Sequence, residues 1–254
     1  MTESLEYRKT YVVHVYDIAS NEYLAIHSLF NYLQDIASEH ATRLRFGRDD
    51  LMKDNRFWVL SRIYARISRW PGWEEKLTIA TWPRGTDRLF ALRDFSISDE
   101  KGGHIASATS SWLVVDKETR RVQRPDSLLT HLQKDLPEGQ ATGRNAGKID
   151  APSGKIHEEP AFPVRHSDID MNLHVNNVNY LRWVTDCYNS SFYRKYMPSS
   201  VEINYLAEAL PGDRVIIRHS MDESSHVSST HSLVREEDNT ELCRIRIEWK
   251  DCDS

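Results

Sequence analysis

A short polar segment occurs twice in the chain, and this repeat constrains the fold more than any other feature of the sequence. The segment Asp17–Asn21, DIASN, resembles Asp168–Asn172, DIDMN, at an offset of 151 residues. Each copy follows a strand-like stretch and precedes a helix-like one. In the same order, Pro71-Gly72 of the first half resembles Pro211-Gly212 of the second, and Pro-Gly pairs mark turns between strands. The two similarities together favour duplication of one structural unit.

A segment from Leu136 to Lys155 separates the two halves. It is rich in Gly, Pro, Ala, Asn and Ser and has little hydrophobic periodicity, which is typical of a linker or a long surface loop. Domains usually contain about 100–150 residues, so a chain of 254 residues accommodates two ordinary ones. We therefore expect an N-terminal domain at 1–135, a linker at 136–156 and a C-terminal domain at 157–254.

The first half is predicted to contain one long helix and several antiparallel strands. Leu29, Leu33 and Ile36 have the three-to-four spacing of a buried stripe, which predicts a helix over Ala25–Phe46. Alternating side chains predict a strand over Trp58–Ala65. The other expected strands of this half are Tyr7–Tyr16 before the helix, and Leu77–Trp82, Leu89–Ser98 and Ile105–Val115 after it.

The second half repeats this order of elements. Its expected elements are a strand at Ala161–His166, a helix near Asn177–Tyr196, and strands at Val201–Tyr205, Arg214–Met221, Ser228–Glu236 and Leu242–Trp249. One long helix with four antiparallel strands is an α+β pattern, and an antiparallel sheet wrapped around one hydrophobic helix is the hotdog arrangement. We therefore predict a tandem double hotdog, in which the two copies form a pseudo-dimer and join their sheets.

The densest polar segment next to a predicted core helix is Arg165–Tyr180, RHSDIDMNLHVNNVNY. Asp, Asn and Ser favour turns and helix caps, so a capped loop without chemistry is the alternative interpretation. Capping uses one or two such residues, whereas here Asp170, Asn172 and His174 alternate. Residues two apart in an extended loop point the same way, so we expect these three side chains to face one pocket.

These residue types fit the hydrolysis of a thioester. That reaction needs a nucleophile, a base that activates it, and donors that stabilise the oxyanion. Asp170 could be the base or orient it, and His174 could move a proton, because imidazoles exchange protons near neutral pH. Asn172 could hold the carbonyl oxygen or the water. The N-terminus of the following helix would present free backbone N–H groups to the developing negative charge.

The run Asp170–Tyr180 has the pattern DxNxHVNNxxY. This pattern closely resembles a motif of the acyl-acyl carrier protein (acyl-ACP) thioesterases of plant plastids and their bacterial relatives. The resemblance implies that Asp170, Asn172 and His174 are catalytic residues.

A second element of that family, EYRREC, corresponds to a stretch of this chain that ends at Ala209. Tyr205 and Glu208 match the element, whereas Leu206 and Ala207 replace its two arginines. Ala209 stands in place of its cysteine, to which a nucleophilic role has been assigned. With no thiol at that position, Glu208 is the expected water-activating base.

The resemblance extends over nearly the whole chain, since Trp112–Asp116, Thr119–Arg121 and the tandem layout also resemble the family. It implies hydrolysis of fatty acyl-ACP to free fatty acid and holo-ACP, which terminates fatty acid synthesis and needs no cofactor. The HVNN motif also occurs in single-domain acyl-CoA thioesterases of the hotdog class, so that activity is the main alternative. A non-enzymatic acyl-binding or dehydratase-like hotdog module is a third reading, and a metal-dependent hydrolase fits the motif least.

At the repeat positions the first half lacks this chemistry, since Asp170 corresponds to Ala19 and His174 to Tyr23. Asn21 remains, but an amide alone cannot activate water. The resemblance implies that this half shapes the acyl-chain pocket. Candidate lining residues are the aromatics Phe30, Phe57, Trp58 and Phe90, although aromatics at these spacings are more often plain core.

The charge of the chain bears on its partners. A net charge of −5 gives no global basic field, which argues against a nucleic-acid partner. A carrier protein is acidic, so its docking surface on this chain should be locally basic. The candidate clusters are Arg43, Arg45 and Arg48 after the first helix, and Arg120, Arg121 and Arg124 near the end of the first half.

Several negative features of the sequence complete these expectations. No apolar stretch approaches the roughly 20 residues needed to cross a bilayer, and the acidic N-terminus MTESLE lacks the apolar run of a signal peptide. Cys187, Cys243 and Cys252 are odd in number, and their spacing matches no zinc-ligand pattern. We therefore expect a cytoplasmic protein with no membrane insertion and no bound metal. A homodimer is compatible with the two-copy layout.

Overall fold

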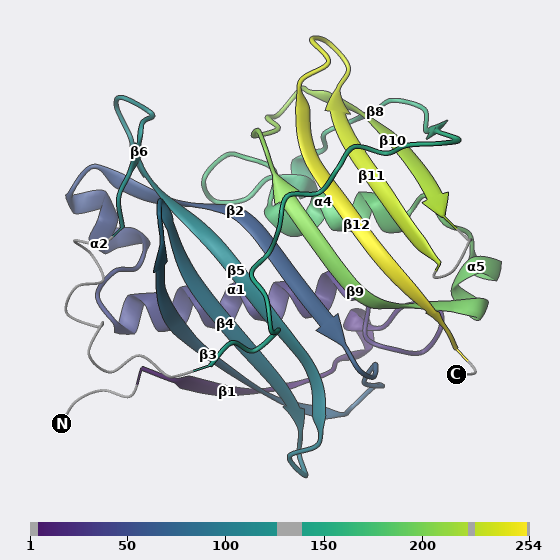
Figure 1. Ribbon diagram of the computed structural model, residues 1–254, viewed down its shortest axis with the longest axis horizontal. Helices are drawn as coiled ribbons and strands as arrows, with labels where there is room; N and C mark the ends of the chain where they lie inside the picture. Colours follow the sequence, from purple (N-terminus) through teal and green to yellow (C-terminus); the bar gives the residue numbers. More distant parts are fainter. Residues whose placement is uncertain (1–4, 126–138, 223–226, 253–254) are drawn as a thin grey trace.

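The computed structural model describes residues 5–125, 139–222 and 227–252, which form a tandem double hotdog (Figure 1). The helical elements are η1 (Val15–Asp17), α1 (Ile26–Arg43), α2 (Arg48–Lys53), η2 (His166–Asp168), α4 (Asn177–Thr185) and α5 (Ser190–Lys195). The strands of the first half are β1 (Tyr7–Val12), β2 (Arg56–Ile67), β3 (Lys76–Asp87), β4 (Phe90–Asp99), β5 (His104–Asp116) and β6 (Val122–Gln123). Those of the second half are β7 (His157–Glu158), β8 (Phe162–Pro163), β9 (Tyr196–Tyr205), β10 (Arg214–Asp222), β11 (Ser228–Arg235) and β12 (Glu241–Asp251).

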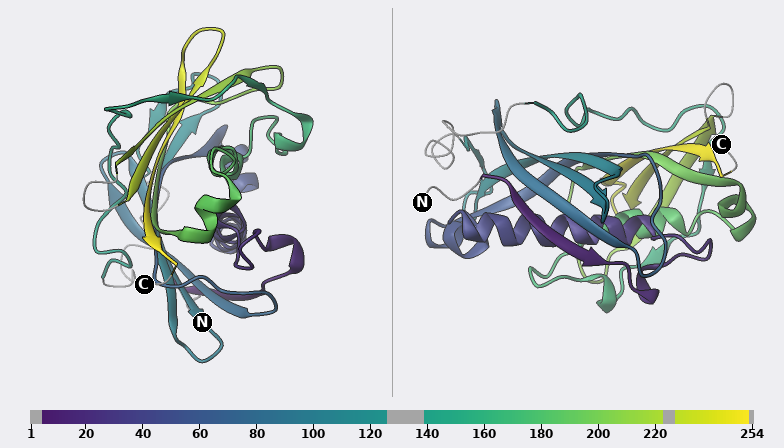
Figure 2. Two further views of the ribbon diagram at one scale, coloured as in Figure 1. Left: turned by 90° about the vertical axis from the view of Figure 1, so that its right-hand side faces the viewer. Right: turned by 90° about the horizontal axis from the view of Figure 1, so that it is seen from below.

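The two halves share one antiparallel sheet, as the sequence predicted. Its strand order is β1-β3-β4-β5-β2-β9-β12-β11-β10-β7, with β6 on β5 and β8 on β10. The seam between the halves is the pairing of β2 with β9, in which Ile63 lies opposite Ile203. Both long helices lie on the same face of this curved sheet (Figure 2).

The first long helix is held by its buried stripe. Leu29, Leu33 and Ile36 are at most 1% exposed and pack into a core to which both halves contribute. Burying each such side chain contributes about 1.5–3 kcal/mol, which is far more than helix propensity supplies. Leu44 follows the last helical residue, and Arg45 at a φ of 61° turns the chain away.

Among the described residues, none of the helices is both long enough and apolar enough to cross a membrane.

The expected single helix over Asn177–Tyr196 is wrong in its second part. The chain leaves the helix at Asp186, and Asn189 then begins α5 by accepting a hydrogen bond from the Phe192 N–H at 3.0 Å. Between the two helices the Tyr188 ring stacks on Phe192 with centroids 4.5 Å apart. A turn here places that ring in the core, and Asn is a favoured capping residue, so packing and capping together override the continuous apolar pattern.

Two strand predictions also needed correction. The expected alternation over Trp58–Ala65 is interrupted, because a β-bulge lies between Leu60 and Arg62 in the pairing of β2 with β5. A bulge adds one residue to a strand, so Leu60 and Ile63 both reach the helix side of the sheet. The expected strand over Ala161–His166 is reduced to Phe162–Pro163, because Pro163 has no N–H for a ladder and η2 starts at His166.

The described part of the segment between the halves, residues 139–156, crosses the face of the sheet opposite the helices (Figure 2). It forms no helix and no strand, as expected, but it is tied to β9. The Gly147 N–H donates to Glu202 at 2.6 Å and the Ile149 N–H donates to Asn204 at 2.9 Å. Arg144 also pairs with Glu202 at 2.6 Å, and Ile149 is 2% exposed. The segment therefore covers the sheet as a fixed strap, unlike a flexible linker.

Candidate active site

The polar loop, residues 168–176, is a tight turn between η2 and α4, so the expectation of an extended loop is wrong. The Asp170 N–H donates to the His174 carbonyl at 2.8 Å, and the Leu173 N–H donates to the Asp170 carbonyl at 3.0 Å. Leu173 has a φ of 64°, in the left-handed region that a turn of this kind requires. The turn brings Asp170 against Asn172, whose backbone N–H and side-chain amide reach the carboxylate at 2.8 and 3.4 Å.

His174 and Glu208 come together across two elements. His174 ends the turn before α4, and Glu208 lies three residues beyond the end of β9. The His174 Nε2 and Glu208 Oε2 atoms are 3.4 Å apart, and both side chains are about one-third exposed. An imidazole and a carboxylate at this separation, open to water, are the pair that general acid–base chemistry uses.

The backbone around Glu208 is fixed by two side chains that the sequence reasoning missed. Arg235 donates to the Glu208 carbonyl at 2.8 Å, and the Ala209 N–H donates to the Tyr180 hydroxyl at 3.0 Å. Tyr180 lies on α4 and Arg235 ends β11, so the segment after β9 is anchored to a helix and to a strand. Only the final Tyr of the motif gave a sequence signal for this anchor.

The other polar residues of the motif position α4. Asn176 is the N-cap, and its side chain accepts from the Val178 N–H at 3.0 Å. Asn179 donates to the Asp168 carbonyl at 2.9 Å, and Arg182 pairs with the Asp168 carboxylate at 2.7 Å. The capping interpretation therefore accounts for these residues and leaves Asp170, Asn172, His174 and Glu208 as the candidates for chemistry.

The first half supplies two arginines to this site. The Arg120 guanidinium contacts Glu208 Oε2 at 2.8 Å, and the Arg48 Nε contacts Asn172 Oδ1 at 3.2 Å. The sequence reasoning placed both arginines in candidate docking clusters and did not connect them with the site. They lie 88 and 124 residues from their partners, so no local pattern could have paired them.

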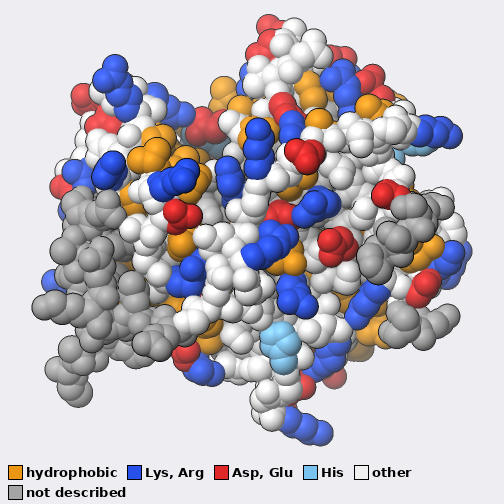
Figure 3. Space-filling view, in the orientation of Figure 1, with side chains coloured by type: hydrophobic (Ala, Val, Ile, Leu, Met, Phe, Trp, Pro, Cys, Tyr) orange, Lys and Arg blue, Asp and Glu red, His pale blue; other side chains and the backbone are white. Residues whose placement is uncertain are grey.

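The remaining members of the two basic clusters are surface residues. Arg43 contacts Glu39 at 2.8 Å and lies over the Tyr7 ring, while Arg45, Arg121 and Arg124 are exposed. Over the face drawn in Figure 3, Lys and Arg side chains are interspersed with Asp and Glu. That face is therefore not one continuous basic patch, and the two clusters stay separate candidates for docking.

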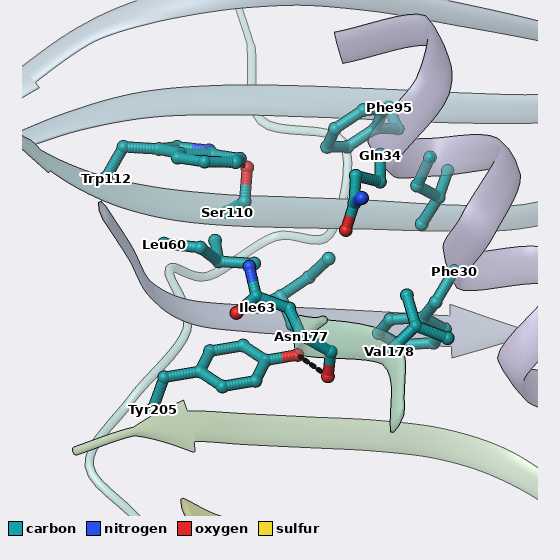
Figure 4. Close-up of a pocket in the computed structure, with 11 residues that line it drawn as sticks. Phe30, Gln34, Leu60, Ile63, Phe95, Ser110, Trp112, Asn177, Val178 and Tyr205 are labelled. Atoms are coloured by element: carbon teal, nitrogen blue, oxygen red, sulfur yellow. Dashed lines mark hydrogen bonds between the residues drawn. The ribbon is translucent and has the colours of Figure 1, made fainter. Parts of the chain in front are cut away.

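An apolar pocket lies between α1 and the sheet (Figure 4). Its lining residues are Phe30, Leu33, Gln34, Leu60, Ile63, Phe95, Ser110, Trp112, Asn177, Val178 and Tyr205. Asn177 lies three residues after His174, and Tyr205 lies three residues before Glu208. The Tyr205 hydroxyl donates to the Asn177 carbonyl at 3.1 Å and joins the two site-bearing segments. Both halves therefore line the pocket, and the second half does so with residues close in sequence to His174 and Glu208.

Of the four aromatics expected to line the pocket, Phe30 does so. The other three have different contacts. Phe57 lies under the Arg120 guanidinium at 5.2 Å, and Phe90 lies under that of Arg62 at 5.3 Å. The Trp58 indole N–H donates to the Phe46 carbonyl at 2.8 Å.

The fold and the site define a class of protein: a double hotdog with a polar acid–base cluster before the N-terminus of α4 and an apolar pocket that both halves line. Comparison with known families is consistent with that class. Residues 4–130 match the acyl-ACP thioesterase N-terminal domain, and residues 153–251 match the acyl-ACP thioesterase C-terminal domain. The chain belongs to the acyl-ACP thioesterase family.

Individual relatives show how far the similarity extends. The chain is 27% identical over 230 residues to the chloroplastic oleoyl-acyl carrier protein thioesterase of Coriandrum sativum, covering 84% of this chain and 62% of that protein. An acyl-ACP thioesterase structure from Bacteroides thetaiotaomicron superposes with a TM-score of 0.84 at 25% identity, covering 97% of this chain and 98% of the other. The 12:0-ACP thioesterase of Umbellularia californica shares the fold, with a TM-score of 0.83 at 22% identity over 97% and 94% of the two chains.

Proposed function

We propose that this chain hydrolyses fatty acyl-ACP thioesters to free fatty acid and holo-ACP and so terminates fatty acid synthesis. One observation carries the proposal: the His174 Nε2 and Glu208 Oε2 atoms lie 3.4 Å apart, and the segments that bear them also contribute Asn177 and Tyr205 to an apolar pocket that both halves line. An acyl chain in that pocket would leave its thioester carbonyl next to the pair. Membership of the family supports thioester hydrolysis as the reaction.

In the proposed reaction, Glu208 takes a proton from water, and the resulting hydroxide attacks the thioester carbonyl. The tetrahedral oxyanion then collapses and the C–S bond breaks. The proton held by Glu208 passes to the departing thiolate through His174, whose Nε2 is 3.4 Å from Glu208, and this returns both side chains to their starting states. The net change is the addition of one water across the C–S bond. The backbone N–H of Asn177, the first residue of α4, and the Asn172 side chain would stabilise the oxyanion.

Asp170 has a positioning role in this scheme. Its carboxylate accepts from the Asn172 backbone N–H at 2.8 Å and lies 3.4 Å from the Asn172 side-chain nitrogen. On the other side of that amide, Arg48 contacts its oxygen at 3.2 Å. The amide is thus held between a carboxylate and a guanidinium, so its orientation is set before substrate arrives.

A division of labour between the halves follows from the same geometry. We propose that residues 1–135 form the acyl-binding half, residues 157–254 form the catalytic half, and residues 136–156 join them. The pocket supports this division, since eight of its eleven lining residues come from the first half. A cytoplasmic location is part of the proposal, and the distribution of a fluorescently tagged chain in its host would test it.

The carrier is tested by offering one acyl group on two carriers. We expect rapid release of free fatty acid from a series of acyl-ACPs, and slower release from the matching acyl-CoAs. Faster turnover of acyl-CoA would replace the proposed function with the acyl-CoA thioesterase alternative. No hydrolysis of either, with tight acyl-ligand binding, would indicate a non-enzymatic module.

Docking of the carrier is tested by charge reversal in the exposed members of each arginine cluster that do not contact the site. Arg45→Glu is compared with Arg121→Glu and Arg124→Glu. Reversal in the true docking cluster should raise KM for acyl-ACP, because it repels the acidic carrier, and should leave the KM for a short acyl thioester unchanged. Unchanged KM values for acyl-ACP in all three variants would reject docking at these clusters.

A further inference from the structure

A second cluster of chemically active side chains lies on the helix side of the catalytic half, away from the site described above. Glu159 follows β7, Cys187 lies in the turn after α4, and His219 is on β10. One ligand atom from each residue lies within 4.8 Å of the other two. The Glu159 Oε1 and His219 Nε2 atoms are 3.2 Å apart. None of these residues is used by the proposed hydrolysis.

Neighbouring imidazoles extend this cluster across three adjacent strands. The His219 ring stacks between His157 of β7 and His231 of β11, with centroid distances of 5.6 Å on both sides. His231 is fully buried, and its ring nitrogens contact the Tyr188 hydroxyl at 2.7 Å and the Ile245 carbonyl at 3.3 Å. Both ring nitrogens of His231 therefore already have hydrogen-bond partners, and this ring packs beside the cluster without being a candidate ligand. His219 has a carboxylate and a thiol beside it, and is therefore the imidazole of this stack that is placed to share a ligand with them.

The three side chains suit zinc. A thiolate, an imidazole and a carboxylate are all zinc ligands, with bond lengths of about 2.0–2.3 Å that place tetrahedral ligand atoms roughly 3.3–3.6 Å apart. The observed separation of 3.2 Å between Glu159 Oε1 and His219 Nε2 is close to that spacing, and the ligand atoms of all three residues lie within 4.8 Å of one another. A Zn²⁺ ion would also be neutralised by one thiolate and one carboxylate. We propose that Glu159, Cys187 and His219 bind a zinc ion, with water as the fourth ligand.

The proposed zinc has a structural role. The nine residues of α4 separate Cys187 from the polar loop, which is a length of about 13 Å at 1.5 Å per residue. The ion therefore lies too far from His174 and Glu208 to activate the attacking water. It would join the turn after α4 to the last strands of the sheet and fix the far end of the helix whose N-terminus carries the site. The sequence spacing of cysteines could not predict this site, because its ligands come from three distant segments.

Zinc binding at this place must displace a proton from the thiol. Burial, with Glu159 and Asp186 nearby, raises the pKa of Cys187 to about 12, so the metal-free thiol is protonated at neutral pH. A metal lowers the pKa of a coordinating thiol and releases its proton on binding.

The test uses the tag-free full-length chain, stripped with a chelator and kept reduced, with Co²⁺ as a spectroscopic probe for the zinc site. We expect one equivalent of Co²⁺ to give a thiolate-to-cobalt charge-transfer band and the intense visible bands of tetrahedral cobalt. Zn²⁺ should abolish these bands and raise Tm. Cys187→Ser should lose the charge-transfer band, and His219→Ala should lose the tetrahedral bands.

Cys252→Ser is the matched control, since it removes an exposed thiol outside the cluster and should keep both kinds of band. Circular dichroism of each metal-free variant separates loss of the site from loss of the fold. A charge-transfer band that persists in Cys187→Ser, or octahedral cobalt without thiolate ligation in the wild-type chain, would overturn the proposal. Because these readouts involve no substrate, they are independent of whether the chain hydrolyses acyl-ACP.

Discussion

The loops before α1 and α4 have the same backbone and different side chains. The Ala19 N–H donates to the Tyr23 carbonyl at 2.8 Å, as Asp170 does to His174 at 2.8 Å. Glu22 has a φ of 68° where Leu173 has 64°. Residues 151 positions apart therefore form equivalent backbone hydrogen bonds in the two loops. Duplication preserved the turn, whereas the groups that can act on a thioester are present in one copy.

The comparison extends to the position of Glu208. The Leu24 N–H donates to the Pro71 carbonyl at 2.8 Å, and the Val175 N–H donates to the Ala209 carbonyl at 3.1 Å. Pro71 is thus equivalent to Ala209, and Trp70 is equivalent to Glu208. The alignment of Pro71-Gly72 with Pro211-Gly212 was therefore wrong by two residues, although both pairs lie in the same turn region.

The residue at that equivalent position has different surroundings in the two halves. Trp70 is 6% exposed, and its indole N–H donates to the Pro198 carbonyl at 2.8 Å, so it packs the first half against β9. Glu208 is one-third exposed and faces His174. The same place in the fold holds a packing residue in one half and a candidate base in the other.

The largest expected effect is on kcat, when the carboxylate of Glu208 is removed. We predict that Glu208→Gln lowers kcat for acyl-ACP by roughly 10²–10⁴-fold, the range that a general base contributes, with little change in Tm. Glu236→Gln is the matched control, since Glu236 also forms a surface ion pair, with Arg214 at 2.6 Å. Near-normal turnover by Glu208→Gln would remove the residue from the mechanism and end the contrast with Trp70.

A second prediction uses the buried histidine of each half. Burial is the main cause that lowers the pKa of His40 and of His231 to about 3, compared with about 6.5 for an unfolded chain. The unfolded state therefore binds more protons between pH 6.5 and 3, so stability is full above pH 6.5 and falls as the pH is lowered through this window. Each histidine should contribute up to about 1.4 kcal/mol per pH unit.

The measurement is urea unfolding across this pH range. His40→Gln and His231→Gln should each flatten the dependence of the unfolding free energy on pH, whereas the exposed His104→Gln should not. A slope equal to that of the wild-type chain in both buried-site variants would contradict the prediction.

A smaller effect on kcat is expected when Arg120, which lies in the first half and contacts Glu208 of the second, is substituted. Arg120 and Glu208 form an ion pair whose side chains are 55% and 36% exposed, and exposed pairs contribute about 0.2–1 kcal/mol. Arg120→Ala should therefore reduce kcat by at most about fivefold, while its exposed neighbour Arg121→Ala leaves kcat unchanged. A loss as large as that of Glu208→Gln would mean that Arg120 takes part in the chemistry directly.

The smallest expected effect comes from substituting two of the candidate catalytic residues into the first loop. Ala19→Asp with Tyr23→His, placed in the Glu208→Gln background, should restore no activity because Trp70 supplies no carboxylate. Both positions are partly or largely exposed, so the unfolding free energy should change by no more than about 0.5 kcal/mol. Recovered hydrolysis would show that the first loop can support the reaction without a carboxylate at the position of Trp70.

Much of the fold could be predicted because local patterns and the overall architecture agree. The stripe of Leu29, Leu33 and Ile36 predicted α1, and the repeat at Asp17 and Asp168 predicted the tandem layout. The break between α4 and α5 was missed, because the ring of Tyr188 packs in the core through contacts with Trp249 at 5.2 Å, which no local window contains.

The candidate site shows the same limit more sharply. Asp170, His174 and Glu208 were accessible from motif likeness, since two short runs carry them. Arg48 and Arg120 were not connected with the site, because they lie on α2 and in the turn between β5 and β6, whereas their partners Asn172 and Glu208 lie in the other half. Long-range pairs of this kind follow from how the halves join, which the periodicity of a sequence does not specify.

That seam has a further consequence for how the chain can be made and divided. In the joined sheet, β2 and β9 are interior strands, each with a partner on both sides. Produced as separate polypeptides, each half would expose one of them as a bare sheet edge, with backbone donors and acceptors open to other chains. The two pieces should then either recombine with each other or aggregate. A single continuous polypeptide avoids this, because it keeps the edges of β2 and β9 paired with each other.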